Sequence, residues 1–148
     1  MKKDTVEKIR QFNRFYTKII GVTNNHILES QYSLSEVRVM YEIHHYPAIT
    51  ARQIMQMVQV DEGYLSRLIA KLVKQKIISK IKSTDDSRAS SLTLTKKGTD
   101  IFLNLSQRSS DAVVGIIQHL DNKEQAELIQ LFNKIENLLT KNISNDNG

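Results

Sequence analysis

The apolar residues of this chain recur every three or four positions along most of its length, and every second position in one short stretch. From about Thr5 to Ser30 this spacing predicts one long amphipathic helix. It returns from Ile101 to Leu120 and from Leu128 to Leu139, which predicts two more helices near the C-terminus. Between the first of these helices and the two near the C-terminus, residues 33–76 show shorter helical patterns.

Capping signals mark where these helices begin. In a capping box, the first and fourth residues each use a side chain to satisfy a backbone donor of the other. Single Ser, Thr or Asp residues before an apolar pattern are weaker start signals of the same kind. The predicted boxes are Ser33-x-x-Glu36, Thr50-x-x-Gln53 and Asp121-x-x-Glu124, and the predicted single caps are Asp61 and Thr95.

Two of the short helices are close neighbours in the sequence. The helix after Thr50 is expected to end near Met57, and the helix after Asp61 continues to about Lys76. The preceding helix should end near His45, because Pro47 disfavours helix in the residue before it. The pair separated by residues 58–60 is a candidate helix-turn-helix.

The period changes to two after this pair. Residues 77–82, "IISKIK", and residues 90–95, "SSLTLT", alternate between apolar and polar positions, as β-strands with one buried face do. The segment between them, "STDDSRA", is polar and rich in turn formers. We expect a β-hairpin, so the predicted fold class is mainly α with a small hairpin wing.

The size of the chain suits one domain, because 148 residues with 40% apolar content can bury a core. We expect residues 33–95 to form a lobe and residues 5–30 and 96–141 to form long helices with more apolar positions than that lobe needs. Those helices either build a homodimer interface or pack as a bundle within one chain. No apolar run of 18 residues and no signal peptide is present, which predicts a cytoplasmic protein.

The charge of the chain is concentrated. Between Gly63 and Lys97 there are nine cations and two anions, so this quarter of the chain has a net charge of +7. The whole chain has a net charge of +5, so the remaining residues together have a net charge of −2. Such a concentration favours a polyanion partner, although scattered surface lysines have the same appearance.

The polar face of the helix after Asp61 is the main candidate site. Arg67 has the donor geometry for guanine, Tyr64 and Ser66 can meet bases or phosphates, and Gly63 lets the backbone approach closely. An ordinary basic surface helix is the alternative. The predicted major-groove residues are Asp61, Gly63, Tyr64, Ser66, Arg67 and Lys71, and the predicted phosphate contacts are Thr50, Lys74, Lys80 and Lys82.

The hairpin tip is the second candidate. Arg88 is placed where a wing reaches the minor groove, whose negative potential attracts arginine. Asp86 is expected to hold the loop or to orient Arg88, with Ser87 between them, while Asp85 points away. The two aspartates and Ser87 are also simple turn formers.

Other chemistry finds little support. Cysteine is absent, which excludes disulfides, thiol nucleophiles and thiolate metal sites. No two of the four histidines have the i, i+4 spacing of a helical zinc site, and the Ser79-x-x-Lys82 match to an acyltransferase motif lies in a predicted strand. We expect no metal, no cofactor and no enzymatic activity.

The ordered set of elements resembles the MarR (multiple-antibiotic-resistance regulator) family of winged-helix transcription factors. The resemblance rests on "SLSEVRVMYEI", on "TARQIMQMVQVDEGYLSRLIAKLVKQKII" and on "DDSRASSLTLTKKG", which fits Asp-x-Arg, then Leu-x-Leu-Thr and Gly. The segments "IRQFNRFYTKIIG" and "YSLSEVRVMYEI" are also similar to regulators fused to an acetyltransferase. No second domain follows within the 148 residues, so acetyl transfer is not expected.

The resemblance implies a function. It implies a homodimer with intertwined first and last helices, a palindromic double-stranded DNA operator, residues 61–71 in the major groove and Arg88 in the minor groove. Repression is the more frequent mode in the family, and release by a small aromatic or phenolic effector is common. The implied effector crevice draws on Phe12, Tyr16, Ile20, Met40 and His44, although core packing is the preferred role for all but Tyr16 and His44.

Two alternatives from other classes stay open on the sequence alone. One is a protein-interaction or ligand-binding module that uses the lobe against protein, and the other is a regulator that partners a separate acetyltransferase. Binding to an operator with a steep salt dependence would favour the regulator, because each neutralised phosphate releases counterions.

Overall fold

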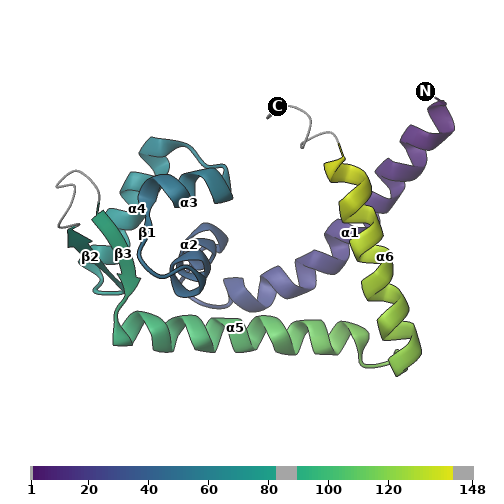
Figure 1. Cartoon of the computed structure of the whole chain (residues 1–148). Coiled ribbons are helices and arrows are strands. Elements are labelled where there is room, and N and C mark those ends of the chain that lie inside the picture. The colour runs from purple at the N-terminus through teal and green to yellow at the C-terminus, as the bar shows by residue number, and fades with distance from the viewer. Residues whose placement is uncertain (1, 83–89, 142–148) are drawn as a thin grey trace. The chain divides into compact units, whose positions relative to one another are not determined.

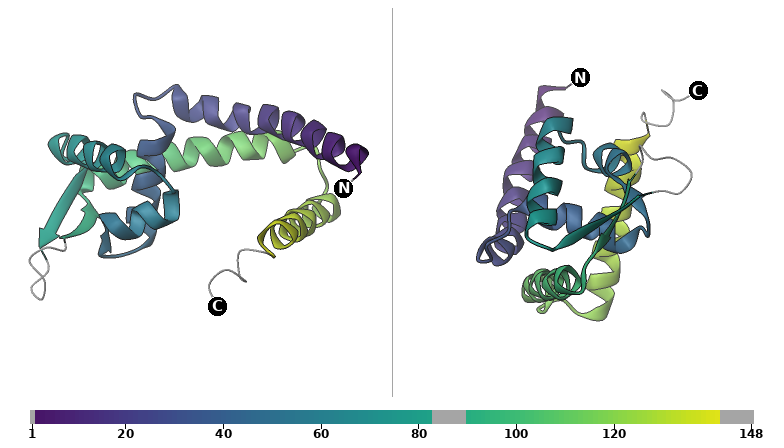
Figure 2. Two further views of the ribbon diagram at one scale, coloured as in Figure 1. Left: turned by 90° about the horizontal axis from the view of Figure 1, so that it is seen from above. Right: turned by 90° about the vertical axis from the view of Figure 1, so that its left-hand side faces the viewer.

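The computed structural model describes residues 2–82 and 90–141, except for the side chains of residues 22–23 and 25–28. These residues fall into two compact units, residues 1–112 and residues 113–148. Figure 1 labels the helices and strands, and Figure 2 shows them from two further directions. The elements of the first unit are α1 (Lys3–Leu28), α2 (Leu34–His45), β1 (Ile49–Thr50), α3 (Ala51–Val58), α4 (Glu62–Lys74), β2 (Ile78–Lys82), β3 (Ser90–Leu94) and the greater part of α5 (Lys96–Ile117).

The predicted caps are all confirmed. Ser33, Thr50 and Asp121 each form a reciprocal capping box with the residue three positions later. Asp61 accepts a hydrogen bond from the backbone N–H of Tyr64 at 3.1 Å. Thr95 accepts one from Gly98 at 3.0 Å. Local chemistry therefore sets where these helices begin, as the sequence indicates.

The sheet has one strand more than the sequence predicts. The hairpin strands β2 and β3 pair antiparallel from Ile78 opposite Leu94 to Lys82 opposite Ser90. The two residues of β1 pair with the other edge of β3, Ile49 opposite Leu92, so the strand order is β1-β3-β2. Two residues carry no alternation, which is why pattern reasoning missed this strand.

The core of the first unit lies where α2, α3 and α4 meet the sheet. Met40, Ile54, Leu72, Ile77 and Leu92 are almost completely buried there and belong to one hydrophobic cluster. Phe102 and Leu105 of α5 complete the cluster. This packing fixes α4 against the rest of the lobe and leaves its opposite side exposed.

The second unit contains the end of α5 and the helix α6 (Asn122–Thr140). None of the residues of α6 is buried in the single chain. Its apolar side chains include Leu131, Ile135 and Leu138, which are exposed, and Leu139, which is 75% exposed. An apolar stripe of this kind is usually the face by which a helix packs against another element.

Candidate nucleic-acid interface

Helix α4 presents two unlike faces because of its residue spacing. Leu65, Leu68, Ile69 and Leu72 recur at helical spacing and are buried against the lobe. The opposite direction on a helical wheel holds Gly63, Arg67, Ala70 and Lys74, all of which are exposed. The exposed face carries two cations and two of the smallest side chains.

Both ends of α4 are fixed by hydrogen bonds. Asp61 caps the N-terminus, where its negative charge also complements the helix dipole. At the C-terminus Lys76 has a positive φ of 59°. Its N–H donates to Val73 O at 3.0 Å, and the N–H of Ile77 donates to Leu72 O at 2.9 Å. This is a Schellman arrangement with lysine at the position that glycine usually takes.

Gly63 keeps the first turn of α4 open. A Cβ at this position would lie 3.5 Å from Nη1 of Arg67 and 3.2 Å from Oδ2 of Asp61. The guanidinium group of Arg67 therefore reaches back toward the N-terminal end of the helix, the direction in which helical side chains lean. The guanidinium group of Arg67 therefore lies near the N-terminal half of α4, and in recognition helices this half contacts the bases.

A groove of about 830 Å³ lies beside α4, lined on this helix by Glu62, Leu65, Ser66 and Ile69 and by none of the four residues of the exposed face. It brings together three predicted DNA contacts, Thr50, Ser66 and Lys80, from α3, α4 and the sheet. It also adds Arg52 and Glu62, which sequence reasoning did not single out. Arg52 follows the cap Thr50 by two residues, at a helix end where the positive dipole disfavours a cation. An arginine at such an unfavourable position is the signal that would have identified it.

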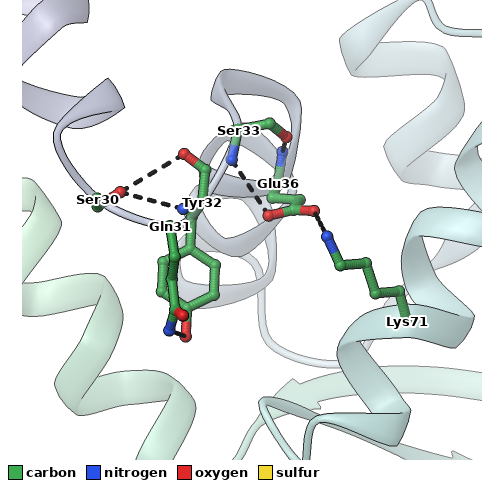
Figure 3. A network of polar contacts seen from close by, with 6 residues as sticks. All are labelled: Ser30, Gln31, Tyr32, Ser33, Glu36 and Lys71. Carbon is green, nitrogen blue, oxygen red and sulfur yellow. Dashed lines mark hydrogen bonds and ion pairs between the residues drawn. The ribbon is translucent and has the colours of Figure 1, made fainter.

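Lys71 lies at the edge of α4 that faces α2, and its ammonium group is already bound. Nζ of Lys71 lies 2.6 Å from Oε1 of Glu36, as Figure 3 shows. The Lys71 side chain is 53% exposed, whereas that of Glu36 is 7% exposed. The hydrogen bond to Glu36, and then its negative charge, raise the pKa of Lys71 above its ordinary value. Sequence reasoning assigned Glu36 only to a helix cap and did not find its bond to Lys71.

The remaining predicted DNA contacts are placed unequally. Tyr64 and Lys74 on α4, and Lys80 and Lys82 on β2, are exposed. The predicted wing residues Asp86, Ser87 and Arg88 lie outside the described residues, so their role stays a prediction.

The predicted effector residues have different surroundings in the single chain, and their role stays a prediction. Phe12 and Tyr16 stack on each other along α1 with ring centroids 5.7 Å apart, while Met40 is fully buried in the core. His44 packs against Phe102, 4.7 Å between centroids, and Ile20 is 40% exposed. A separate open cavity of about 510 Å³ is lined by Ser30, Gln31, Tyr32, Lys97, Asp100, Ile101, Asn104, Leu105 and Arg108.

The family model described as "MarR family" matches residues 32–90. The HTH-type transcriptional regulator BilQ of Clostridium symbiosum is 31% identical over 91 residues, which are 60% of this chain. The match spans 63% of the length of that curated relative, less than two thirds.

Solved structures share the fold. A MarR family protein from Bacillus stearothermophilus has a TM-score of 0.81 at 9% identity, over 95% of this chain and 99% of that one. A mutant MarR from E. coli complexed with operator DNA has a TM-score of 0.71 at 21% identity, over 89% and 95% of the two chains.

The fold and the site define a winged helix-turn-helix protein, with six helices and a small antiparallel sheet. Residues 32–90 match the model of the MarR family, and the chain is similar over 91 residues to an HTH-type transcriptional regulator. None of the helices in the described part of the chain is long and apolar enough to cross a membrane.

Proposed function

We propose that this protein is a sequence-specific transcription regulator that binds a palindromic operator in double-stranded DNA as a homodimer. The observation that carries the proposal is the exposed face of α4, where Gly63, Arg67, Ala70 and Lys74 combine positive charge with an open backbone. Asp61, Tyr64, Ser66 and Lys71 flank that face. We place its action in the bacterial cytoplasm and expect repression, the more frequent mode in the family.

The surroundings of α4 support DNA binding. Arg52 and Lys80 border the adjoining groove, and Lys82 extends the positive charge along β2. Such cations suit contacts with phosphates, which position a protein on the duplex. Arg67 has the two parallel N–H donors that can bind guanine in a bidentate manner. Glu62 is the one anion that lines this groove among the described residues, and it belongs to the first turn of α4, where a negative charge stabilises the helix.

The homodimer has support in each unit by itself. On α1 the side chains of Ile9, Phe12 and Phe15 are exposed, and on α6 no residue is buried. Apolar helix faces of this extent are covered in obligate dimers, whose interfaces resemble a core cut in half. Two copies of α4 would then meet two half-sites about one helical turn apart.

An effector is a further part of the proposal. The open cavity at Ser30–Tyr32 and α5 has Lys97 and Arg108 on its wall, with Asp100 and Asn104 between them. Such a wall suits a small organic anion with an apolar body that contacts Ile101 and Leu105. This cavity is a second candidate site, beside the predicted crevice at Tyr16 and His44.

Selection of random duplex DNA on the purified protein tests the proposal. We expect a palindromic winner that binds about 10³-fold or more tightly than a scrambled duplex. Arg67→Ala should cost about 1–3 kcal/mol on that winner and relax the preference at one base pair. Arg10→Ala, an exposed arginine of α1, is the matched control and should change neither quantity.

The opposite results are equally definite. Absence of any enriched sequence, with all binding lost at physiological salt, would reduce the surface to a general polyanion patch. Equal losses on operator and scrambled DNA for Arg67→Ala would remove its role in reading bases.

A further inference from the structure

Glu36 stands at the centre of a polar network that joins α2 to α4. Its Oε2 accepts a hydrogen bond from the backbone N–H of Ser33 at 3.2 Å, and its own N–H donates to Ser33 Oγ at 3.2 Å. Its other oxygen, Oε1, accepts from Lys71 Nζ at 2.6 Å. Figure 3 shows both contacts on one carboxylate.

The capping box with Ser33 fixes the position of the carboxylate that binds Lys71. Because the capping box and burial hold the Glu36 carboxylate still, Oε1 is a fixed point on the lobe and not a mobile surface charge. A buried carboxylate is costly without a cation, so Lys71 is held to that point. Lys71 lies one turn after Arg67, and its anchoring restrains the rotation of α4 about its own axis.

The position of Lys71 around α4 makes it less suited to a phosphate contact than Lys74. On the helical wheel Lys71 is displaced from the centre of the exposed face toward α2, whereas Lys74 lies near that centre. An ammonium group bound to a carboxylate on the α2 side has one of its three donors engaged and its charge largely neutralised. Lys74 has no such contact among the described residues and suits a phosphate better.

We propose that Glu36 is a positioning residue for DNA reading, which orients Arg67 through its ion pair with Lys71, and that Lys71 acts by holding α4 and not by neutralising a phosphate. This inference rests on the proposed function. It predicts that loss of the ion pair lowers discrimination between operator and other DNA while the number of neutralised phosphates stays the same.

The chain itself supplies a substitution that separates the cap from the ion pair. In the second capping box glutamine does the work of glutamate, since Gln53 Oε1 accepts from Thr50 N at 2.9 Å. Glu36→Gln therefore keeps the cap through its oxygen and turns its amide donors toward the Lys71 ammonium group. Glu124→Gln is the matched control, because Glu124 accepts from Asp121 N at 2.9 Å and has no ion-pair partner among the described residues.

The test titrates each variant on the selected operator and on a scrambled duplex at several salt concentrations. We expect Glu36→Gln and Lys71→Ala to lower the ratio of operator to scrambled affinity about five- to twentyfold, the scale of one lost base contact. The salt slope on the scrambled duplex should not change. Lys71→Arg should retain most of the ratio, and Glu124→Gln all of it.

Lys74→Ala supplies the contrast that a phosphate contact would give. It should weaken both duplexes alike and reduce the salt slope by about 0.9. Far-ultraviolet circular dichroism of each variant verifies that the helices remain. Lys71→Ala is a second way to remove the ion pair, since it removes an exposed side chain and leaves the cap at Glu36 intact.

Three outcomes overturn the inference. Lys71→Ala behaving as Lys74→Ala would make Lys71 a phosphate contact, and an unchanged ratio for folded Glu36→Gln would remove the positioning role. In both cases the wild-type protein still selects an operator, so the proposed function stands. A wild-type protein that selects no sequence overturns both.

Discussion

Gly98 packs directly against the backbone carbonyl group of Ile77. A Cβ at Gly98 would overlap the carbonyl oxygen and lie 2.9 Å from the carbonyl carbon. The same carbonyl oxygen accepts a hydrogen bond from the backbone N–H of Thr95 at 3.0 Å, and Thr95 Oγ1 also donates to Lys76 O at 2.6 Å. The start of α5 is thereby fixed to the residues that link α4 to β2.

Gly98→Ala should therefore destabilise the lobe. The neighbour that must move is backbone and not the end of a flexible side chain, so we expect a loss of about 1–3 kcal/mol or more in the free energy of unfolding. Urea denaturation measures it. Gly63→Ala is the control, because its nearest neighbour is the carboxylate of Asp61 at 3.2 Å, which can shift, and the change should stay within about 0.5 kcal/mol. Equal stability of both variants would contradict the close packing at Ile77.

Asp61→Ala removes the cap of α4. The backbone N–H of Tyr64 loses its acceptor, and we expect a loss of about 0.5–2 kcal/mol in the free energy of unfolding, again by urea denaturation. Asp61→Asn retains an acceptor oxygen and should lose much less. If the two variants are equally destabilised, the charge of Asp61 and not its hydrogen bond is what stabilises the helix.

Leu138→Glu tests the homodimer. Leu138 shares the apolar stripe of α6 with Leu131 and Ile135, and a charge in the middle of a dimer interface is costly. We expect the dimer dissociation constant, measured by sedimentation equilibrium, to rise about 100-fold or more. Asn137→Glu lies on the opposite side of α6 and should leave the constant unchanged. A monomeric wild-type protein would refute the dimer directly.

The ion pair of Lys71 predicts a dependence of stability on pH. Because its pKa in the folded protein is raised above 10.5, the pair contributes stability below that pH and loses it as the pH rises through the folded pKa. The difference in unfolding free energy between wild type and Lys71→Ala should be constant from about pH 7 to pH 9 and shrink above about pH 10.5. For Lys74→Ala the difference should not follow this course. A difference for Lys71→Ala that does not shrink above about pH 10.5 would contradict a stabilising pair with Glu36.

Much of the fold was predictable because its signals are local. The capping boxes at Ser33, Thr50 and Asp121 need only residues three positions apart, and all three form as expected. The alternation in residues 77–82 and 90–95 likewise predicted β2 and β3. Local chemistry of this kind is readable in a single sequence, whatever the tertiary packing does later.

The parts that could not be predicted depend on contacts between distant residues. The pairing of Ile49 with Leu92 and the bond of Lys71 to Glu36 join residues tens of positions apart. Nothing in the sequence around Glu36 shows that its second oxygen faces α4. Core packing was the preferred role of both Met40 and Phe12; Met40 is fully buried, whereas Phe12 is 42% exposed on α1.

The two faces of α4 have a consequence for how this protein can change over evolutionary time. Leu65, Leu68 and Leu72 maintain the fold, and no described core contact depends on Gly63, Arg67 or Lys74. Under the proposed function, substitutions on the outward face would alter what is recognised without threatening folding. A duplicated copy of this gene would be free to drift toward a new target while remaining a stable protein, so long as the leucines and the Glu36–Lys71 pair persist.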